Sequence, residues 1–188
     1  VVAPKSGYLL SYNTFISSIN NKAGNKDIKL FKNELSGKYF HSFLNDKLTL
    51  KLSAECGNVY SWNDAKLRVV DRFNLGEPRL RGFTPDGIGP RVKLQDDAKR
   101  QDALGGTTYY NITSELTIPI KQERGMDLSI AMFIDAGSLW GLGYIPTTEE
   151  KVKINDSSSL RVSVGAGVII NTPMLPVRLD FAIPIKQE

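Results

Sequence analysis

The sequence has 188 residues, a formal net charge of +4 at pH 7 and a pI near 9.1. Its lysines and arginines are scattered among nearly as many acids and form no basic stripe, so nucleic acid is not an expected partner. The single cysteine, Cys56, excludes an internal disulfide, and the single histidine, His41, excludes a histidine-rich metal site. We therefore expect no metal and no cofactor. No apolar run approaches the roughly 18 residues of a spanning helix, so any membrane insertion must use strands.

Apolar and polar residues alternate with a period of two through most of the chain, which predicts about seven β-strands. In the segment 47–57, for example, Leu48 and Leu50 fall on one face and Lys51 and Glu55 on the other. No amphipathic helix competes with these segments. In chain order, the expected strands cover residues 6–19, 27–43, 47–57, 110–120, 126–137, 160–170 and 177–183.

The connections between these strands alternate in length. The short turns are 43–46, 121–125 and 171–175, and the long polar connections are 20–26, 58–105 and 138–158. Short turns at one end and long loops at the other are typical of an antiparallel up-and-down barrel in an outer membrane. The long loop 58–105 exceeds the usual loop length, so we expect it to be functional or ordered by contacts of its own.

Alternation by itself fits either a membrane barrel or a soluble β-sandwich, because both have one apolar face. Several expected strands reach the about 9–11 residues of a transmembrane strand, whereas soluble strands average about 5–6. The polar face suits a watery lumen, since it carries Lys51, Glu55, Glu115, Asp135, Arg161, Arg178 and Asp180. Aromatic residues near the strand ends are candidates for interfacial girdles, namely Tyr8, Tyr12, Tyr39, Tyr60, Trp62, Tyr109, Tyr110, Trp140 and Tyr144. We predict an all-β chain that forms part of a transmembrane β-barrel, with a soluble β-sandwich binding module as the alternative.

The stretch "NLGEPRLRGFTPDGIGPR" (74–91) places Arg81 beside Gly82 in the middle of the long loop. The glycine permits a positive φ or a close backbone approach. Leu80, Phe83 and Ile88 are apolar residues that would avoid water, so we expect this loop to pack against something, and the nearest place is the lumen.

Three motifs in this order resemble a known family. Leu80-Arg81-Gly82-Phe83 is similar to the (V/I)RG(F/Y) signature of the surface-antigen barrel superfamily, which includes the outer-membrane assembly factors of the BamA type. "FIDAG" (133–137) is similar to its F-x-D-x-G strand motif, which here contains Phe133 and Gly137. "SLRVSVGAGVIINTPMLPVRLDFAIPI" (159–185), with Arg178 and Asp180, resembles its C-terminal stretch.

This resemblance implies a barrel of about sixteen strands, of which residues 1–188 would supply about strands nine to fifteen as a partial C-terminal barrel domain. The segment 58–105 would be an extracellular loop that folds back into the lumen. Arg81 would reach two acids on the inner wall, Glu115 and Asp135, and act as a latch through charge-assisted hydrogen bonds. We expect Arg178 and Asp180 to be a lumen-facing pair that fixes register and not catalytic residues.

The function that the resemblance implies is assembly and insertion of β-barrel proteins into the bacterial outer membrane. Its partners would be unfolded outer-membrane proteins, accessory assembly lipoproteins and the lipid bilayer. The alternative within the superfamily is a two-partner secretion transporter that exports a polypeptide through its barrel. An outer-membrane enzyme is disfavoured, because it would need a nucleophile and a base and His41 is the one histidine of the sequence. The family's last strand, the first half of its barrel and its periplasmic domains are not matched.

Overall fold

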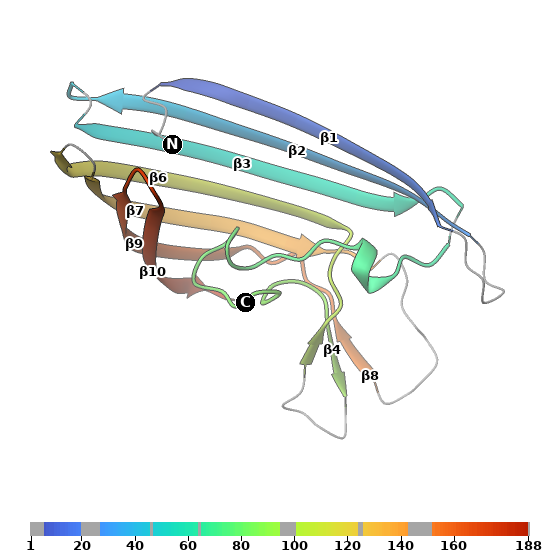
Figure 1. The fold of residues 1–188 in the computed structure, drawn as a ribbon. Coiled ribbons are helices and arrows are strands. Elements are labelled where there is room, and N and C mark those ends of the chain that lie inside the picture. Colours follow the sequence, from blue (N-terminus) through green and yellow to red (C-terminus); the bar gives the residue numbers. More distant parts are fainter. Residues whose placement is uncertain are drawn as a thin grey trace.

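The structure is a computed structural model that describes residues 6–19, 27–45, 47–63, 65–94, 101–123, 126–142 and 152–187. Seven long strands form one sheet in the order β1-β2-β3-β6-β7-β9-β10, and neighbouring strands are antiparallel (Figure 1). The bounds are Gly7–Ile19 for β1, Ile28–Phe43 for β2, Leu48–Ser61 for β3, Thr108–Glu123 for β6, Met126–Trp140 for β7, Arg161–Asn171 for β9 and Pro176–Lys186 for β10. The prediction of an all-β antiparallel meander is confirmed.

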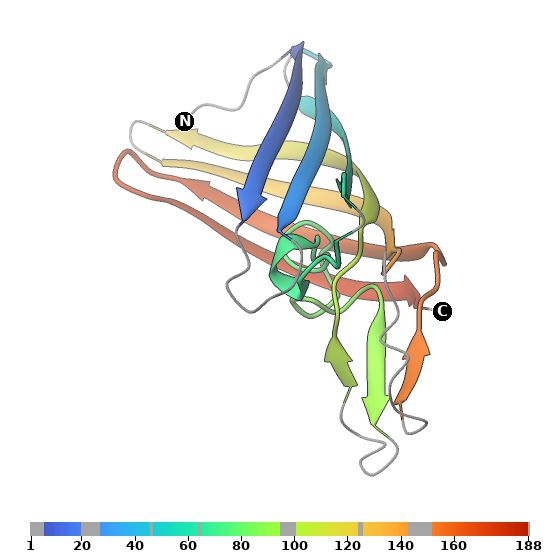
Figure 2. The same ribbon diagram turned by 90° about the vertical axis from the view of Figure 1, so that its right-hand side faces the viewer.

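The sheet curves around the long segment between β3 and β6, which lies on its concave side (Figures 1 and 2). Within the described residues the sheet is not closed, and β1 and β10 form its two edges. The alternative of a soluble β-sandwich is wrong, because a sandwich would need a second sheet packed face to face over the apolar side. The one other sheet in this part of the chain is small and projects from the end of the large one in both views.

The two faces of the sheet are inverted relative to a soluble protein. Ile112, Ile134 and Leu179 lie on the convex face with 51%, 54% and 57% of their surface exposed. Glu115 and Asp135 lie on the concave face and are 4% and 0% exposed. Because a large apolar surface exposed to water is unfavourable, this arrangement suits a sheet whose convex face contacts lipid.

A compact apolar core lies at one end of the sheet, where the long connections begin. Leu75, Leu80 and Ile88 of the segment between β3 and β6 are buried there, and Phe83 packs against them partly buried. The remaining members come from strand ends and from the same segment: Ile28, Leu30, Val59, Leu67, Phe73, Tyr109 and Leu139. The loop thus supplies half of a core that the wall of the sheet does not form by itself.

The expected aromatic girdles need one correction. Tyr109 is 2% exposed and packs on the Phe73 ring at a centroid distance of 4.7 Å, so it belongs to the inner core and not to an interface. Side chains alternate between the two faces along β6, and Tyr109 shares the concave face with Glu115. Tyr60 and Trp62 are exposed and flank Phe31. Tyr144 lies outside the described residues.

The expectation of one long loop over 58–105 is wrong in part. Strand β3 continues to Ser61, and the segment contains a 3-10 turn, η1 (Val69–Asp71), and the short strands β4 (Arg91–Leu94) and β5 (Gln101–Ala103). Strand β4 pairs with β5 and with β8 (Val152–Asn155), which comes from the connection between β7 and β9. The sequence did not show these strands, since each has only three or four residues and the pairing of β4 with β8 joins distant segments. Among the described residues, no helix has the length and hydropathy needed to cross a bilayer.

A charge on the convex face tests the orientation of the sheet. We expect Ile134→Arg to destabilise the full-length protein in lipid vesicles by about 2–4 kcal/mol, as for arginine at a bilayer midplane. The matched control is Ser36→Arg, which adds the same side chain to the concave face of β2 beside its register partner Glu55. Unfolding in urea, followed by heat-modifiable migration, measures both. Equal destabilisation by the two variants would contradict the assignment of the convex face to lipid.

Candidate functional site

The arginine loop is held on the concave face by short backbone contacts. Leu75 and Ile88 form an isolated antiparallel bridge, and Phe73 forms another with Gly106. Between the arms of this loop, the N–H of Leu80 donates to the carbonyl of Gly76 at 3.0 Å. The result is a tight turn that buries Leu80 completely and presents the next residue, Arg81, to the sheet.

Arg81 contacts two carboxylates on neighbouring strands. Its Nε and Nη2 donate to the two carboxylate oxygens of Asp135 at 2.7 and 2.8 Å, and its backbone N–H donates to Oδ2 of the same carboxylate at 3.2 Å. Its Nη1 donates to Oε2 of Glu115 at 2.9 Å. The guanidinium also lies 3.3 Å from the centroid of the Phe133 ring. A planar fork can satisfy both acids at once, which a lysine ammonium cannot do.

The charge on Arg81 is maintained despite its burial. Its side chain is 12% exposed, and loss of solvent lowers the pKa of the guanidinium. Hydrogen bonds to Asp135 and then to Glu115 raise the pKa by more, so it lies above the ordinary value for arginine. The group is therefore a permanent cation in this site.

Each of the three motif residues on β7 lies against a residue of the loop. Phe133, Asp135 and Gly137 alternate along one face of the strand, so all three point to the concave side. Phe133 and Asp135 contact Arg81, while Gly137 leaves room for Leu80. A Cβ on Gly137 would lie 2.7 Å from Cδ1 of Leu80 and 2.8 Å from the Tyr110 carbonyl oxygen. The motif thus forms one seat for two consecutive loop residues.

Gly82 brings the loop backbone against the last two strands. Its φ of +85° lies in the left-handed region that favours glycine, and a Cβ there would be 3.2 Å from the Cβ of Ala182 and 3.4 Å from that of Ser163. Arg81 and Gly82 together therefore contact the strands β6, β7, β9 and β10.

Two further residues of the seat were not singled out from the sequence. Asn111 donates from Nδ2 to the carbonyl of Arg79 at 2.8 Å and so fixes the residue before the motif. Gly165 on β9 leaves space for the ring of Phe133, which a Cβ would overlap. The alternation of side chains along the strand could have pointed to Gly165, because it falls on the polar face of β9, which pairs with β7.

Arg178 and Asp180 lie on the concave face of β10, and their contacts extend beyond the strand. Nε of Arg178 donates to Oδ2 of Asp180 at 2.7 Å, which is the expected local pair. Arg178 also donates to both carboxylate oxygens of Glu115, at 3.1 and 2.6 Å, and Asp180 accepts from Nη1 of Arg81 at 3.3 Å. Lys51 completes the cluster, 3.9 Å from Glu115.

These groups are suited to holding a segment in place and not to bond chemistry. Arginine does not act as a base, and the acids of the site are occupied by cations. His41 lies apart, between the rings of Tyr39 and Phe43. In the part of the chain that the structure describes, no group of three or more His, Cys, Asp or Glu residues could hold a metal.

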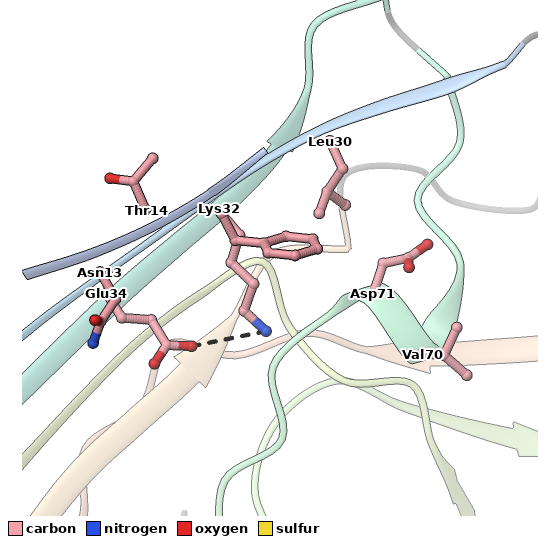
Figure 3. A pocket seen from close by; sticks show the side chains of 8 residues that line it. Asn13, Thr14, Leu30, Lys32, Glu34, Val70 and Asp71 are labelled. Carbon is pink, nitrogen blue, oxygen red and sulfur yellow. Dashed lines mark ion pairs between the residues drawn. The ribbon is translucent and has the colours of Figure 1, made fainter. Parts of the chain in front are cut away.

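A separate cavity of about 510 Å³ lies between β1, β2 and η1. Figure 3 shows Lys32 and Glu34 of β2 on one side, 3.8 Å apart, and Val70 and Asp71 of η1 on the other. Hydrogen bonds from Arg68 lower the pKa of the Asp71 carboxyl. The cavity is open, and its lining mixes polar residues with the apolar side chains of Phe15, Leu30 and Val70. We assign no ligand to it.

Comparison with known proteins identifies the family. The family described as "Omp85 superfamily domain" matches residues 1–188 of the chain. The chain belongs to the Omp85 superfamily. It is 33% identical over 189 residues to the outer membrane protein assembly factor BamA of Neorickettsia risticii (strain Illinois), covering 92% of this chain and 24% of that protein. It is 32% identical over 142 residues to a SAM50-like protein of Schizosaccharomyces pombe, covering 73% and 28%.

The fold has a counterpart among solved structures. The crystal structure of BamA from Haemophilus ducreyi lacking POTRA domains 1-3 aligns with a TM-score of 0.71 at 20% identity, over 98% of this chain and 36% of that one. The expected surface-antigen resemblance is thus confirmed, and this Omp85 chain is part of an integral outer-membrane β-barrel. The Neorickettsia risticii relative is named an assembly factor, and neither relative is named an enzyme, in agreement with the expectation. The chain spans about a quarter of the length of these curated relatives, 24% and 28%.

The glycine of the strand motif provides a test of loop seating. We expect Gly137→Ala to loosen the loop by about 1–3 kcal/mol, because the added methyl overlaps Leu80 and the strand cannot move away. Gly37→Ala is the control, since a Cβ there would meet only Leu10, at 3.8 Å. Limited trypsin digestion of the full-length protein in vesicles measures cleavage after the loop arginines. Protection equal to that of the control would show that Gly137 is not part of the seat.

Proposed function

We propose that this chain is the barrel part of an outer-membrane assembly factor, which folds and inserts other β-barrel proteins into the bacterial outer membrane. The observation that carries the proposal is the loop motif seated on the concave face, with Arg81 bonded to Asp135 and Glu115. The names of two relatives above 30% identity support it, because one is named an assembly factor and the other a SAM50-like protein.

The loop seat acts as a latch in this proposal. A barrel that accepts substrate strands must open at one place and remain defined elsewhere, since lipid cannot satisfy an open strand edge. Seating the loop across β6, β7, β9 and β10 holds four consecutive strands in one arrangement. The partners are unfolded outer-membrane proteins and accessory assembly lipoproteins, with the bilayer around the convex face.

A two-partner secretion transporter, which exports a polypeptide through its barrel, is the alternative within the superfamily. The two hypotheses predict different locations for the substrate protein. An assembly factor leaves its substrate folded in the same membrane, whereas a transporter releases it on the far side. The full-length protein, reconstituted in phospholipid vesicles with an unfolded outer-membrane protein, distinguishes them. Heat-modifiable substrate in the vesicle membrane supports assembly, and protease-protected soluble substrate inside the vesicles supports export.

The latch is tested in the same assay. We expect Arg81→Lys to slow substrate folding by about tenfold or more, because it removes charge-assisted hydrogen bonds worth about 1.5–3 kcal/mol each from buried carboxylates. Arg79→Lys is the control in the same loop, since its side chain is 40% exposed and its Nε lies 3.8 Å from Oε2 of Glu55. Trypsin cleavage of the loop should rise for the first variant alone. An Arg81→Lys protein with normal loop protection and normal folding rate would refute the latch.

A further inference from the structure

The last strand of the described sheet is tied to a strand that is not its neighbour. Between β6 and β10 lie β7 and β9, so the two are separated by three strand spacings, roughly 14 Å along a flat sheet. Side chains stand nearly perpendicular to a sheet, so Glu115 and Arg178 would not meet if the sheet were flat. Their two hydrogen bonds, at 3.1 and 2.6 Å, therefore require the curvature and in turn hold it.

The charges form a closed ring of alternating sign. Arg81 donates to Glu115, Glu115 accepts from Arg178, Arg178 donates to Asp180, and Asp180 accepts from Arg81. Outside the ring, Asp135 binds Arg81 and Lys51 approaches Glu115. The six groups carry three positive and three negative charges, so the cluster is neutral. Only one of its members, Arg81, comes from the loop.

When the loop leaves, the acids of the strands are left with unequal numbers of cationic partners. Without Arg81, Glu115 and Asp180 still share Arg178 as their cation, whereas Asp135 loses its fork. Without Arg178, the loop cation must neutralise Glu115, Asp135 and Asp180 with the help of Lys51. The two arginines thus link β6 to β10 by two routes, since each donates to both Glu115 and Asp180, and removal of either one leaves the other as the remaining link.

We propose that Arg178 and Asp180 are positioning residues that form a brace across the concave face, and that the brace couples the seating of the Arg81 loop to the position of β10. The brace therefore sets where β10 stands relative to β6. In the assembly function proposed above, on which this role rests, seating the loop adds the contacts of Arg81 with Glu115 and Asp180 as a second link between the two strands, and release of the loop leaves Arg178 as the remaining link of this cluster.

The test measures the strand position directly in the full-length protein in lipid vesicles. Spin labels replace Leu52 of β3 and Leu179 of β10, both exposed on the convex face, after Cys56→Ala removes the thiol within residues 1–188. Leu52 lies at the level of the brace, next to Lys51. Because both labels stand on the convex side, flattening of the sheet moves them together. We expect Arg178→Gln to shorten and broaden the distance distribution, and Lys38→Gln, on the concave face of β2, to leave it unchanged.

Coupling gives a second readout that a local structural role would not produce. Arg178→Gln should raise trypsin cleavage of the loop, and Arg81→Lys should shift the distance between the labels in the same direction as Arg178→Gln. Arg178→Lys keeps the positive charge and should bring the label distance and the loop protection only part of the way back to the wild-type values. A lysine ammonium lacks the planar guanidinium that donates to both Glu115 and Asp180. Asp180→Asn, an isosteric change, replaces Arg178→Gln if that variant does not give heat-modifiable barrel.

The results separate the brace from the proposed function, because neither readout requires a substrate. A label distance and a loop protection equal to those of Lys38→Gln would overturn the brace even if the protein assembles substrates normally. A shift in both readouts would support the brace even in a protein that folds no substrate. A shift in label distance with unchanged loop protection would overturn the coupling.

Discussion

The guanidinium of Arg81 lies between the carboxylates of Asp135 and Glu115, and most other features of this structure serve that contact. A buried cation needs partners on several sides, and here the strands of the wall provide them. The acids come from two adjacent strands, and the ring of Phe133 lies below. The cost of burying these charges is offset only because every contact in the set is made together.

The contact also explains why the inner wall has the composition it has. On an ordinary sheet, the covered face is apolar and the exposed face is polar. Here the covered face has Asn111, Glu115 and Asp135 at 5%, 4% and 0% exposure, and glycines occupy the points where the loop approaches most closely. The apolar packing that the wall lacks is supplied at one end, where Leu75, Leu80 and Ile88 of the loop meet the strand ends. The loop thus has an apolar anchor and an ionic seat in different places.

An ionic seat has properties that an apolar one would not have. Buried ion pairs contribute less to net stability than apolar residues of similar volume, but they tolerate few alternative geometries. A loop held by such a seat is fixed in one position when it is bound and has charged groups that water can solvate when it leaves. The second cation, Arg178, stays paired with Glu115 and Asp180 whether the loop is bound or released. The seat is therefore suited to a segment that has a defined position and can also be released.

The sequence by itself determined the strands, their faces and the loop motif. Alternation with a period of two identified all seven long strands and placed Glu115, Asp135, Arg178 and Asp180 on one polar face, because parity along a strand is a local property. Local pattern did not reveal the short strands β4, β5 and β8, of which β4 and β8 pair across two distant connections, or the inward position of Tyr109. It did not show that Arg178 reaches Glu115, or that Gly137 and Gly165 make room for Leu80 and Phe133. Those contacts depend on how strongly the sheet curves and where the loop enters it, and only the packing of segments far apart in the chain decides both.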